Sequence, residues 1–151
     1  MAVSFDLFGT LVDADRPADP AAALVAAFDP AVETRDGASE AVAAAADRGP
    51  VAVLSNCSVP QLARRTLIRS ALDRDAFDAA VTSVACGWRK PHDRAFETVA
   101  DRLDADAADL LHVGDDPRTD GGVERCGGAF LDVADVSLAE FPDWLEGRAC
   151  P

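Results

Sequence analysis

The sequence has little positive charge, and Lys90 is its only lysine. Fourteen Lys and Arg residues stand against 27 Asp and Glu residues, so the formal net charge is −13. Contacts with nucleic-acid phosphates need clustered Lys and Arg side chains. We therefore expect no nucleic-acid partner.

A long hydrophobic run is also absent. No apolar stretch approaches the roughly 18 residues that a membrane span needs, and the N-terminus lacks the basic and apolar segments of a secretion signal. We expect a cytoplasmic protein with no membrane partner. The abundant alanine and dispersed acidic residues resemble the composition of salt-adapted haloarchaeal proteins, in which net charge maintains solubility.

Metal-binding cysteine patterns are missing as well. The four cysteines, Cys57, Cys86, Cys126 and Cys150, show no CxxC spacing, and the two histidines have no partners at ligand-like spacing. We therefore expect reduced thiols rather than a disulfide framework, and no zinc site.

What the sequence does contain is a regular alternation of apolar strands and amphipathic helices. At 151 residues, the chain is long enough for one domain with a single core. We expect strands at 2–6, 51–54, 79–82, 110–113 and 129–131, and helices at 21–28, 37–47, 60–74, 93–103, 121–126 and 138–145. This alternation predicts a Rossmann-like, three-layer α/β/α sandwich with a five-stranded parallel sheet.

Polar residues lie at the carboxyl ends of three of these strands, and a lysine lies in a loop before a helix. The candidates are Asp6, Ser55, Lys90, Asp115, Asp116 and Asp120. Ligands of open α/β sheets bind at the carboxyl ends of the strands, so we expect these side chains to converge. Carboxylates from two strands would repel one another in a partly dry site. A Mg²⁺ ion, which prefers hard oxygen ligands, would relieve that repulsion.

These residue types predict phosphoryl transfer to a carboxylate. Asp6 would attack the phosphorus, while the metal ion and the Lys90 ammonium would neutralise the developing charge. The Ser55 hydroxyl and neighbouring backbone N–H groups would hold phosphate oxygens. Water would then hydrolyse the acyl phosphate.

The same residues resemble the four motifs of the haloacid dehalogenase (HAD) superfamily of hydrolases. The motifs stand in the family's order at 5–11, at 54–56, at 90–91, and at 113–116 with Asp120 beyond. The resemblance covers essentially the whole chain. It implies a single HAD-like hydrolase domain over residues 1–151.

The resemblance also implies a role for each site residue. Asp6 would be the nucleophile, and Lys90 would orient it. The implied metal ligands are Asp6, the backbone carbonyl of Phe8, Asp115, and Asp116 or Asp120 directly or through water. The implied phosphoryl-binding residues are Thr10, Ser55, Asn56 and Lys90.

Some of these residues also have simpler interpretations. Ser55 and Asn56 could cap the following helix, and Asp116 and Asp120 could be charges that favour a helix N-terminus. Asp6 could be a turn aspartate. The presence of all four motifs in order favours the functional interpretation.

The chain departs from the family at Phe8. HAD phosphatases usually carry a second aspartate at this position, and such a general acid is worth about 10²–10⁴-fold in rate. The substrate could have a good leaving group, as in an acyl phosphate or pyrophosphate, or Asp13 or Asp15 could supply the acid. The chain could also be a binding or scaffold protein that has lost catalysis. Dehalogenases of the family carry an aromatic residue there, but they work without metal and lack the acidic cluster.

The segment available for a cap is short. Residues 13–35 are too few for the usual helical lid, so we expect a short insert and no substantial cap domain. Lids exclude water and add selectivity. An open site would suit a large substrate or receive a lid from a neighbouring subunit of a homo-oligomer. We therefore expect a Mg²⁺-dependent phosphatase, with a silent HAD-like binding protein as the rival.

Overall fold

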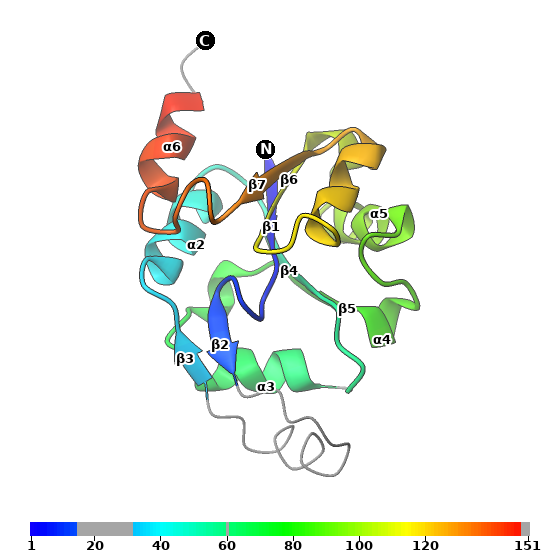
Figure 1. Cartoon of the computed structure of the whole chain (residues 1–151), viewed down its shortest axis with the longest axis horizontal. Coiled ribbons are helices and arrows are strands. Elements are labelled where there is room, and N and C mark those ends of the chain that lie inside the picture. The colour runs from blue at the N-terminus through cyan, green and yellow to red at the C-terminus, as the bar shows by residue number, and fades with distance from the viewer. Residues whose placement is uncertain (15–31, 60, 149–151) are drawn as a thin grey trace.

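The computed structural model describes residues 1–14, 32–59 and 61–148. Its centre is a five-stranded sheet in the order β5-β4-β1-β6-β7, in which all neighbouring strands are parallel (Figure 1). The strands are β1 (Ala2–Phe5), β4 (Val51–Ser55), β5 (Ala79–Thr82), β6 (Leu110–Gly114) and β7 (Ala129–Asp132). This confirms the expected five-stranded parallel sheet.

The three inner strands are buried along their whole length. Every residue of β1, β4 and β6 is buried, as expected for parallel strands that are covered on both faces. The N-terminal strand lies in the middle and pairs with β4 on one side and β6 on the other. Its end is therefore flanked by the ends of two strands that come much later in the sequence.

Helices cover both faces of the sheet. The first group contains α2 (Ala38–Ala46), α3 (Leu62–Arg69) and α6 (Phe141–Arg148), which pack in one apolar cluster with Val3 and Phe5 of β1. On the other face, α5 (Asp93–Arg102) and the 3₁₀ segment η3 (Asp120–Cys126) form a second cluster with Ala2 and Leu110. Figure 1 shows α2 and α6 on one side of the sheet and α5 on the other.

Alternation of side chains along β1 and β6 explains the two clusters. Val3 and Leu111 contribute to the first cluster, whereas Ala2 and Leu110 contribute to the second. Successive side chains of a strand point to opposite faces. The next residues facing α5 and η3 are therefore Ser4 and His112, which are register partners.

Several elements differ from the sequence-based expectation. A hairpin of β2 (Val12–Ala14) and β3 (Val32–Thr34) forms at the edges of the expected insert, where three-residue strands give no readable alternation. The expected helix at 121–126 is 3₁₀ and begins with Asp120, Gly121 and Gly122, since glycine disfavours the α-helix. The expected helix at 21–28 lies outside the described residues.

Short elements and helix ends account for the remaining differences. The structure adds α4 (Ser83–Cys86) and the 3₁₀ turns η1 (Arg74–Ala76) and η2 (Ala107–Asp109). The last helix begins at Phe141 rather than near 138. The preceding turn is closed by reciprocal hydrogen bonds between Ser137 and Glu140, with the pattern of a capping box. Among the described residues, no helix is long and apolar enough to cross a membrane.

The contact between Phe141 and Phe5 gives a test of the first apolar cluster. Both rings are fully buried and meet edge to face with centroids 5.7 Å apart. We expect Phe141→Ala to lower the free energy of unfolding by about 3–5 kcal/mol in urea denaturation, because it removes a buried ring and leaves a cavity. Ile68→Ala is the control, since Ile68 is 48% exposed. Equal losses of unfolding free energy in the two variants would contradict this packing.

Candidate active site

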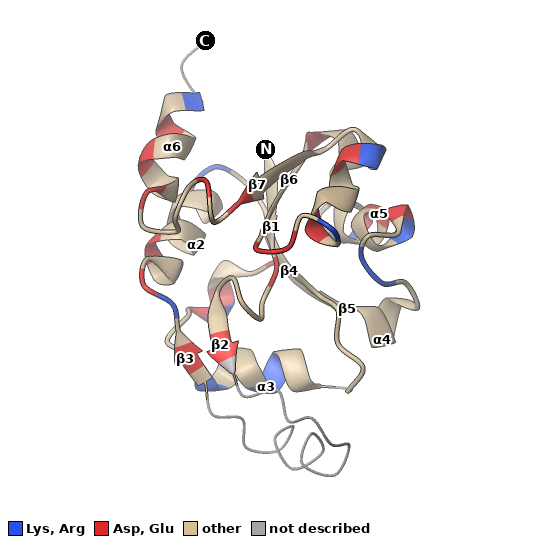
Figure 2. Cartoon of the chain, viewed as in Figure 1, with Lys and Arg blue, Asp and Glu red and all other residues tan. Residues whose placement is uncertain are grey.

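The carboxyl ends of β1 and β6 bring acidic residues from distant parts of the sequence together. The backbone N–H of Asp6 donates to the Val113 carbonyl oxygen at 2.8 Å. This bond continues the β1–β6 pairing, so Asp6 lies next to the loop that starts at Asp115. In Figure 2, red segments of ribbon mark acidic residues at the ends of both strands.

Asp6, Asp115 and Asp120 form the carboxylate cluster of the site. Each offers one oxygen atom, and these atoms all lie within 4.8 Å of one another. The Thr10 hydroxyl lies 3.4 Å from Asp6 Oδ2 and 3.3 Å from Asp115 Oδ1. Asp6 and Asp120 are buried, whereas Asp115 is exposed. Three hard oxygen donors with an open side suit a divalent cation such as Mg²⁺.

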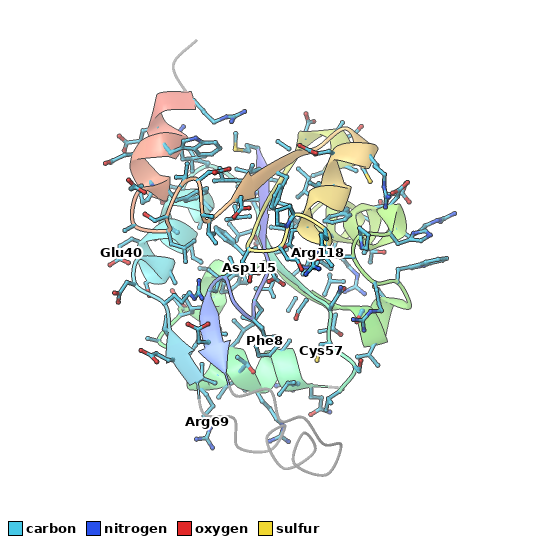
Figure 3. All side chains as sticks on the ribbon, in the orientation of Figure 1. Phe8, Glu40, Cys57, Arg69, Asp115 and Arg118 are labelled. Carbon is cyan, nitrogen blue, oxygen red and sulfur yellow. The ribbon has the colours of Figure 1, made fainter. Side chains whose placement is uncertain are left out.

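Gly9 leaves the space that Asp115 needs. Its φ is +83°, and a Cβ at this position would lie 2.5 Å from Asp115 Oδ2. Any other residue would be strained in the left-handed region and would clash with the carboxylate. Figure 3 shows Asp115 near the middle of the molecule, with Phe8 on the turn beyond β1.

Lys90 places its ammonium group between two of the carboxylates. Its Nζ donates to Asp6 Oδ1 at 2.8 Å, to Asp120 Oδ1 at 2.6 Å and to the Leu54 carbonyl at 3.0 Å. These contacts use the three N–H donors of the ammonium. Lys90 is 3% exposed, so these short contacts lie away from screening by bulk water.

The backbone of Lys90 is fixed by Asn56. The Asn56 side-chain oxygen accepts from the Lys90 N–H at 2.8 Å, and its amide nitrogen donates to the Lys90 carbonyl at 2.9 Å. This pair ties the loop before α5 to the end of β4. Ser55, the last residue of β4, is 1% exposed and pairs in register with Thr82.

The environment of Asp6 disfavours its charged form. Burial raises the pKa of the Asp6 carboxyl from an ordinary value of 3.8 to about 6, and Lys90 opposes the effect while Asp120 and Asp115 reinforce it. Two neighbouring negative charges thus act in the same direction as desolvation. A cation at the cluster would reverse this balance.

Asp120 is held in its charged form by donors. Burial acts to raise its pKa, but hydrogen bonds from His112 and Lys90 and the positive charge of Lys90 outweigh this and hold the pKa well below its ordinary range. His112 Nε2 lies 3.0 Å from Asp120 Oδ1, and Ser4 Oγ lies 2.8 Å from His112 Nδ1. Burial lowers the pKa of the His112 ring from 6.5 to about 4, so the ring is neutral at neutral pH.

The structure distinguishes the two acidic residues beyond Asp115. The Asp120 carboxylate lies in the cluster. The Asp116 carboxylate instead forms a two-pronged ion pair with Arg118, at 3.1 Å for both contacts, which lowers the pKa of Asp116. Only the backbone N–H of Asp116 faces inward, where it donates to Asp120 Oδ2 at 3.1 Å.

Sequence reasoning missed Ser4 and His112, which are fully buried behind the cluster. The available signal was a polar residue within an otherwise apolar run on each of two inner strands. Phe8 is 7% exposed and belongs to the first apolar cluster. Asp13 lies on β2 and pairs with Arg35 at 3.0 Å, with both side chains well exposed.

The raised pKa of Asp6 predicts how Asp6→Asn changes stability with pH. Ionisation of Asp6 opposes folding in metal-free protein, so this cost is absent below about pH 4 and complete above about pH 6 to 7. As the pH rises over this range, the unfolding free energy of Asp6→Asn should therefore increase by about 3 kcal/mol relative to that of wild type. Urea denaturation in a chelator measures the gap, with exposed Asp101→Asn as the control. Parallel pH curves for Asp6→Asn and wild type would contradict the expectation.

Comparison with known protein families identifies one matching sequence model. The model describes haloacid dehalogenase-like hydrolases and matches residues 18–122, which is more than half of the chain. Among curated proteins, none matches the chain.

Solved structures share the fold at low sequence identity. A 2-haloacid dehalogenase from Pseudomonas syringae is 16% identical with a TM-score of 0.71, covering 97% of this chain and 98% of its own. A HAD phosphatase from Thermococcus onnurineus is also 16% identical, with a TM-score of 0.66 and coverage of 87% and 85%. The HAD hydrolase YfnB from Bacillus subtilis, bound to magnesium, is 19% identical with a TM-score of 0.64 and coverage of 78% and 56%.

These structural likenesses concern the fold, and they include both a dehalogenase and a phosphatase. The sequence match is the evidence for the family. The carboxyl ends of β1 and β6 carry the acidic cluster, next to a buried lysine. With more than half of its length matched, the chain belongs to the haloacid dehalogenase-like hydrolase family.

Proposed function

We propose that the chain is a Mg²⁺-dependent phosphohydrolase that acts through an aspartyl-phosphate on Asp6. The observation that carries the proposal is the position of Asp6, hydrogen-bonded to a buried lysine and within a cluster of carboxylate oxygens spanning 4.8 Å. A nucleophilic carboxylate, a fixed cation and a site for a metal ion are the components that phosphoryl transfer to aspartate needs.

The residues present fit a magnesium ion. Asp6, Asp115 and Asp120 would hold it, with the Phe8 backbone carbonyl as the further ligand that the family resemblance implies. The Asp116 carboxylate, the alternative to Asp120 in that resemblance, is engaged with Arg118. When bound, the ion would neutralise the clustered carboxylates and withdraw charge from the phosphoryl oxygens. The raised pKa of Asp6 supports this fit, because burial first, and the charges of Asp120 and Asp115 after it, disfavour the Asp6 anion, and a bound cation would offset both effects.

The chain's own residues supply the remaining chemistry. An Asp6 carboxylate oxygen forms a bond to phosphorus, and the bond to the leaving oxygen breaks with its electron pair on the leaving group. Water then attacks the phosphorus of the acyl phosphate and releases inorganic phosphate and Asp6. Thr10 and Ser55 are the proposed substrate-binding residues, and the family resemblance implies Asn56 and Lys90 as well.

Lys90 acts mainly by orienting Asp6. Its three N–H groups are already engaged with Asp6, Asp120 and the Leu54 carbonyl, so contact with a phosphoryl oxygen would require exchange of one partner. The Asn56 amide likewise uses both its oxygen and its nitrogen in hydrogen bonds to the Lys90 backbone. Both residues therefore contribute to a preorganised nucleophile.

Phe8 favours substrates that need little protonation of the leaving group. Its ring is buried with the apolar cluster and cannot transfer a proton. Asp13, one of the two nearest acids in sequence, is engaged with Arg35, and Asp15 lies outside the described residues. An acyl phosphate or phosphoanhydride provides the leaving group that this site requires.

A second candidate is hydrolysis of a 2-haloacid, also through an ester on Asp6. The observation favouring it is the aromatic residue at position 8, which family dehalogenases share. The carboxylate cluster argues against it, since attack by Asp6 on carbon needs no cation. Chloride release from 2-chloropropionate in the presence of a chelator would support the dehalogenase.

Purified protein should hydrolyse acetyl phosphate and p-nitrophenyl phosphate when Mg²⁺ is supplied. Phosphate release is the measurement, in molar KCl because we propose a salt-adapted protein. Asp6→Asn should lower kcat by about 10³-fold or more because it removes the nucleophile, whereas exposed Asp101→Asn should leave it unchanged. Activity that survives in Asp6→Asn, or no turnover of either substrate, would contradict the proposal and favour a silent binding protein.

Phe8→Asp should broaden the range of leaving groups. A carboxyl at this position would supply a general acid, so hydrolysis of an alkyl phosphate should rise by about 10²-fold. Hydrolysis of acetyl phosphate should change little, because its leaving group is already acidic. Phe8→Leu is the matched control, since it removes the ring without adding an acid. Fast wild-type turnover of alkyl phosphates would show that another residue supplies the proton.

A further inference from the structure

A buried polar pair lies directly behind the carboxylate cluster. Ser4 of β1 and His112 of β6 are register partners on the face that α5 and η3 cover. Both are 0% exposed, and the Phe96 ring meets the His112 ring edge to face at 5.3 Å. The proposed chemistry does not use either residue.

The hydrogen bonds of this pair form a donor chain in which Ser4 donates to His112 and His112 donates to Asp120. A carboxylate can only accept, so the contact of 3.0 Å between His112 Nε2 and Asp120 Oδ1 places a proton on Nε2. In a neutral ring, Nδ1 then carries a lone pair, and the Ser4 hydroxyl donates to it at 2.8 Å. The Asp120 carboxylate thus selects the ring form in which Nε2 donates, and the Ser4 hydroxyl supports this form by donating to Nδ1.

The pair controls how the Asp120 carboxylate is oriented. Oδ1 accepts from His112 and Lys90, while Oδ2 accepts from the Asp116 N–H at 3.1 Å. Gly114 makes room for this orientation, since a Cβ there would lie 2.1 Å from Asp120 Oδ2. Without the His112 donor, Oδ1 would keep only Lys90, and the carboxylate could turn.

We infer that Ser4 and His112 are positioning residues that act through Asp120 on Lys90 and, through Lys90, on Asp6. The consequence for turnover rests on the proposed function. The effect on the Lys90 ammonium and on the carboxylate cluster is independent of the proposed function. A buried serine–histidine pair contributes less to stability than apolar side chains of similar size would, so stability alone does not explain its presence among the apolar residues on this face of the sheet.

Three substitutions at position 112 separate donation from packing. His112→Gln keeps an N–H donor the same number of bonds from Cβ as Nε2, whereas His112→Asn holds its amide one bond short. His112→Leu fills the space without any donor. Ser4→Ala removes only the hydroxyl that donates to Nδ1. Phe96→Leu, which alters packing against the ring, is the structural control.

Because Lys90 is the only lysine, its side chain can be observed alone. Protein made with isotope-labelled lysine should show one side-chain ammonium resonance with slow proton exchange in wild type. We expect exchange to accelerate about 10-fold or more in His112→Leu and His112→Asn, and to remain slow in His112→Gln and Phe96→Leu. This measurement uses metal-free protein and needs no substrate.

Mg²⁺ affinity and turnover provide the second readout. Loss of a group that orients a ligand costs about 10–100-fold in metal affinity or activity. We expect that loss in Mg²⁺ affinity, by calorimetric titration, and in kcat for His112→Leu, with KM for acetyl phosphate within about 3-fold. His112→Gln should retain most of the wild-type Mg²⁺ affinity and kcat. If wild type shows no turnover, the ammonium resonance and the Mg²⁺ titration still decide the positioning role.

A double-mutant cycle tests whether Ser4 acts only through His112. Ser4→Ala should weaken Mg²⁺ binding in the wild-type background and have no further effect in the His112→Leu background. Independent, additive effects would overturn the proposed relay. The relay would also be overturned if the proton exchange rate of the Lys90 ammonium were unchanged in both His112→Leu and His112→Asn. Equal losses of Mg²⁺ affinity in His112→Gln and His112→Leu would overturn it as well.

Discussion

One ammonium group between two buried carboxylates is the interaction on which the site depends. Lys90 Nζ contacts Asp6 and Asp120 at 2.8 and 2.6 Å in a region that excludes bulk water. Burial of such charges is costly unless each is paired and hydrogen-bonded. The surrounding structure meets that condition, because the Leu54 carbonyl, the His112 ring and the Asp116 N–H complete the hydrogen bonding.

The two faces of the sheet have different roles. The face covered by α2, α3 and α6 carries an apolar cluster that includes the Phe5–Phe141 contact. The opposite face holds polar groups among apolar ones, with Ser4 and His112 beside Phe96. Asp120 and Lys90 reach the site from η3 and from the loop before α5, both on this second face. The apolar face maintains the sheet, and the other face can then accommodate buried charge.

Much of the fold followed from the sequence because the inner strands are mostly apolar runs. Strands buried on both faces give such runs, and Asp6 and Asp115 follow two of them directly. The β2–β3 hairpin could not be predicted, since three residues per strand show no alternation. Choosing between Asp116 and Asp120 also needed the structure, because the path of the loop sends one carboxylate to Arg118 and the other to Lys90. Ser4 and His112 were hidden because their neighbours in sequence are apolar.

The central position of β1 has a consequence for how the protein is made. Asp6 leaves the ribosome well before its ammonium partner, which lies 84 positions later, and the Ser4–His112 contact spans 108 positions. Closing such long loops delays folding until late in synthesis. A nascent chain therefore carries Asp6 without its counter-charge, and a formed site reports that β1 has paired with β4 and β6.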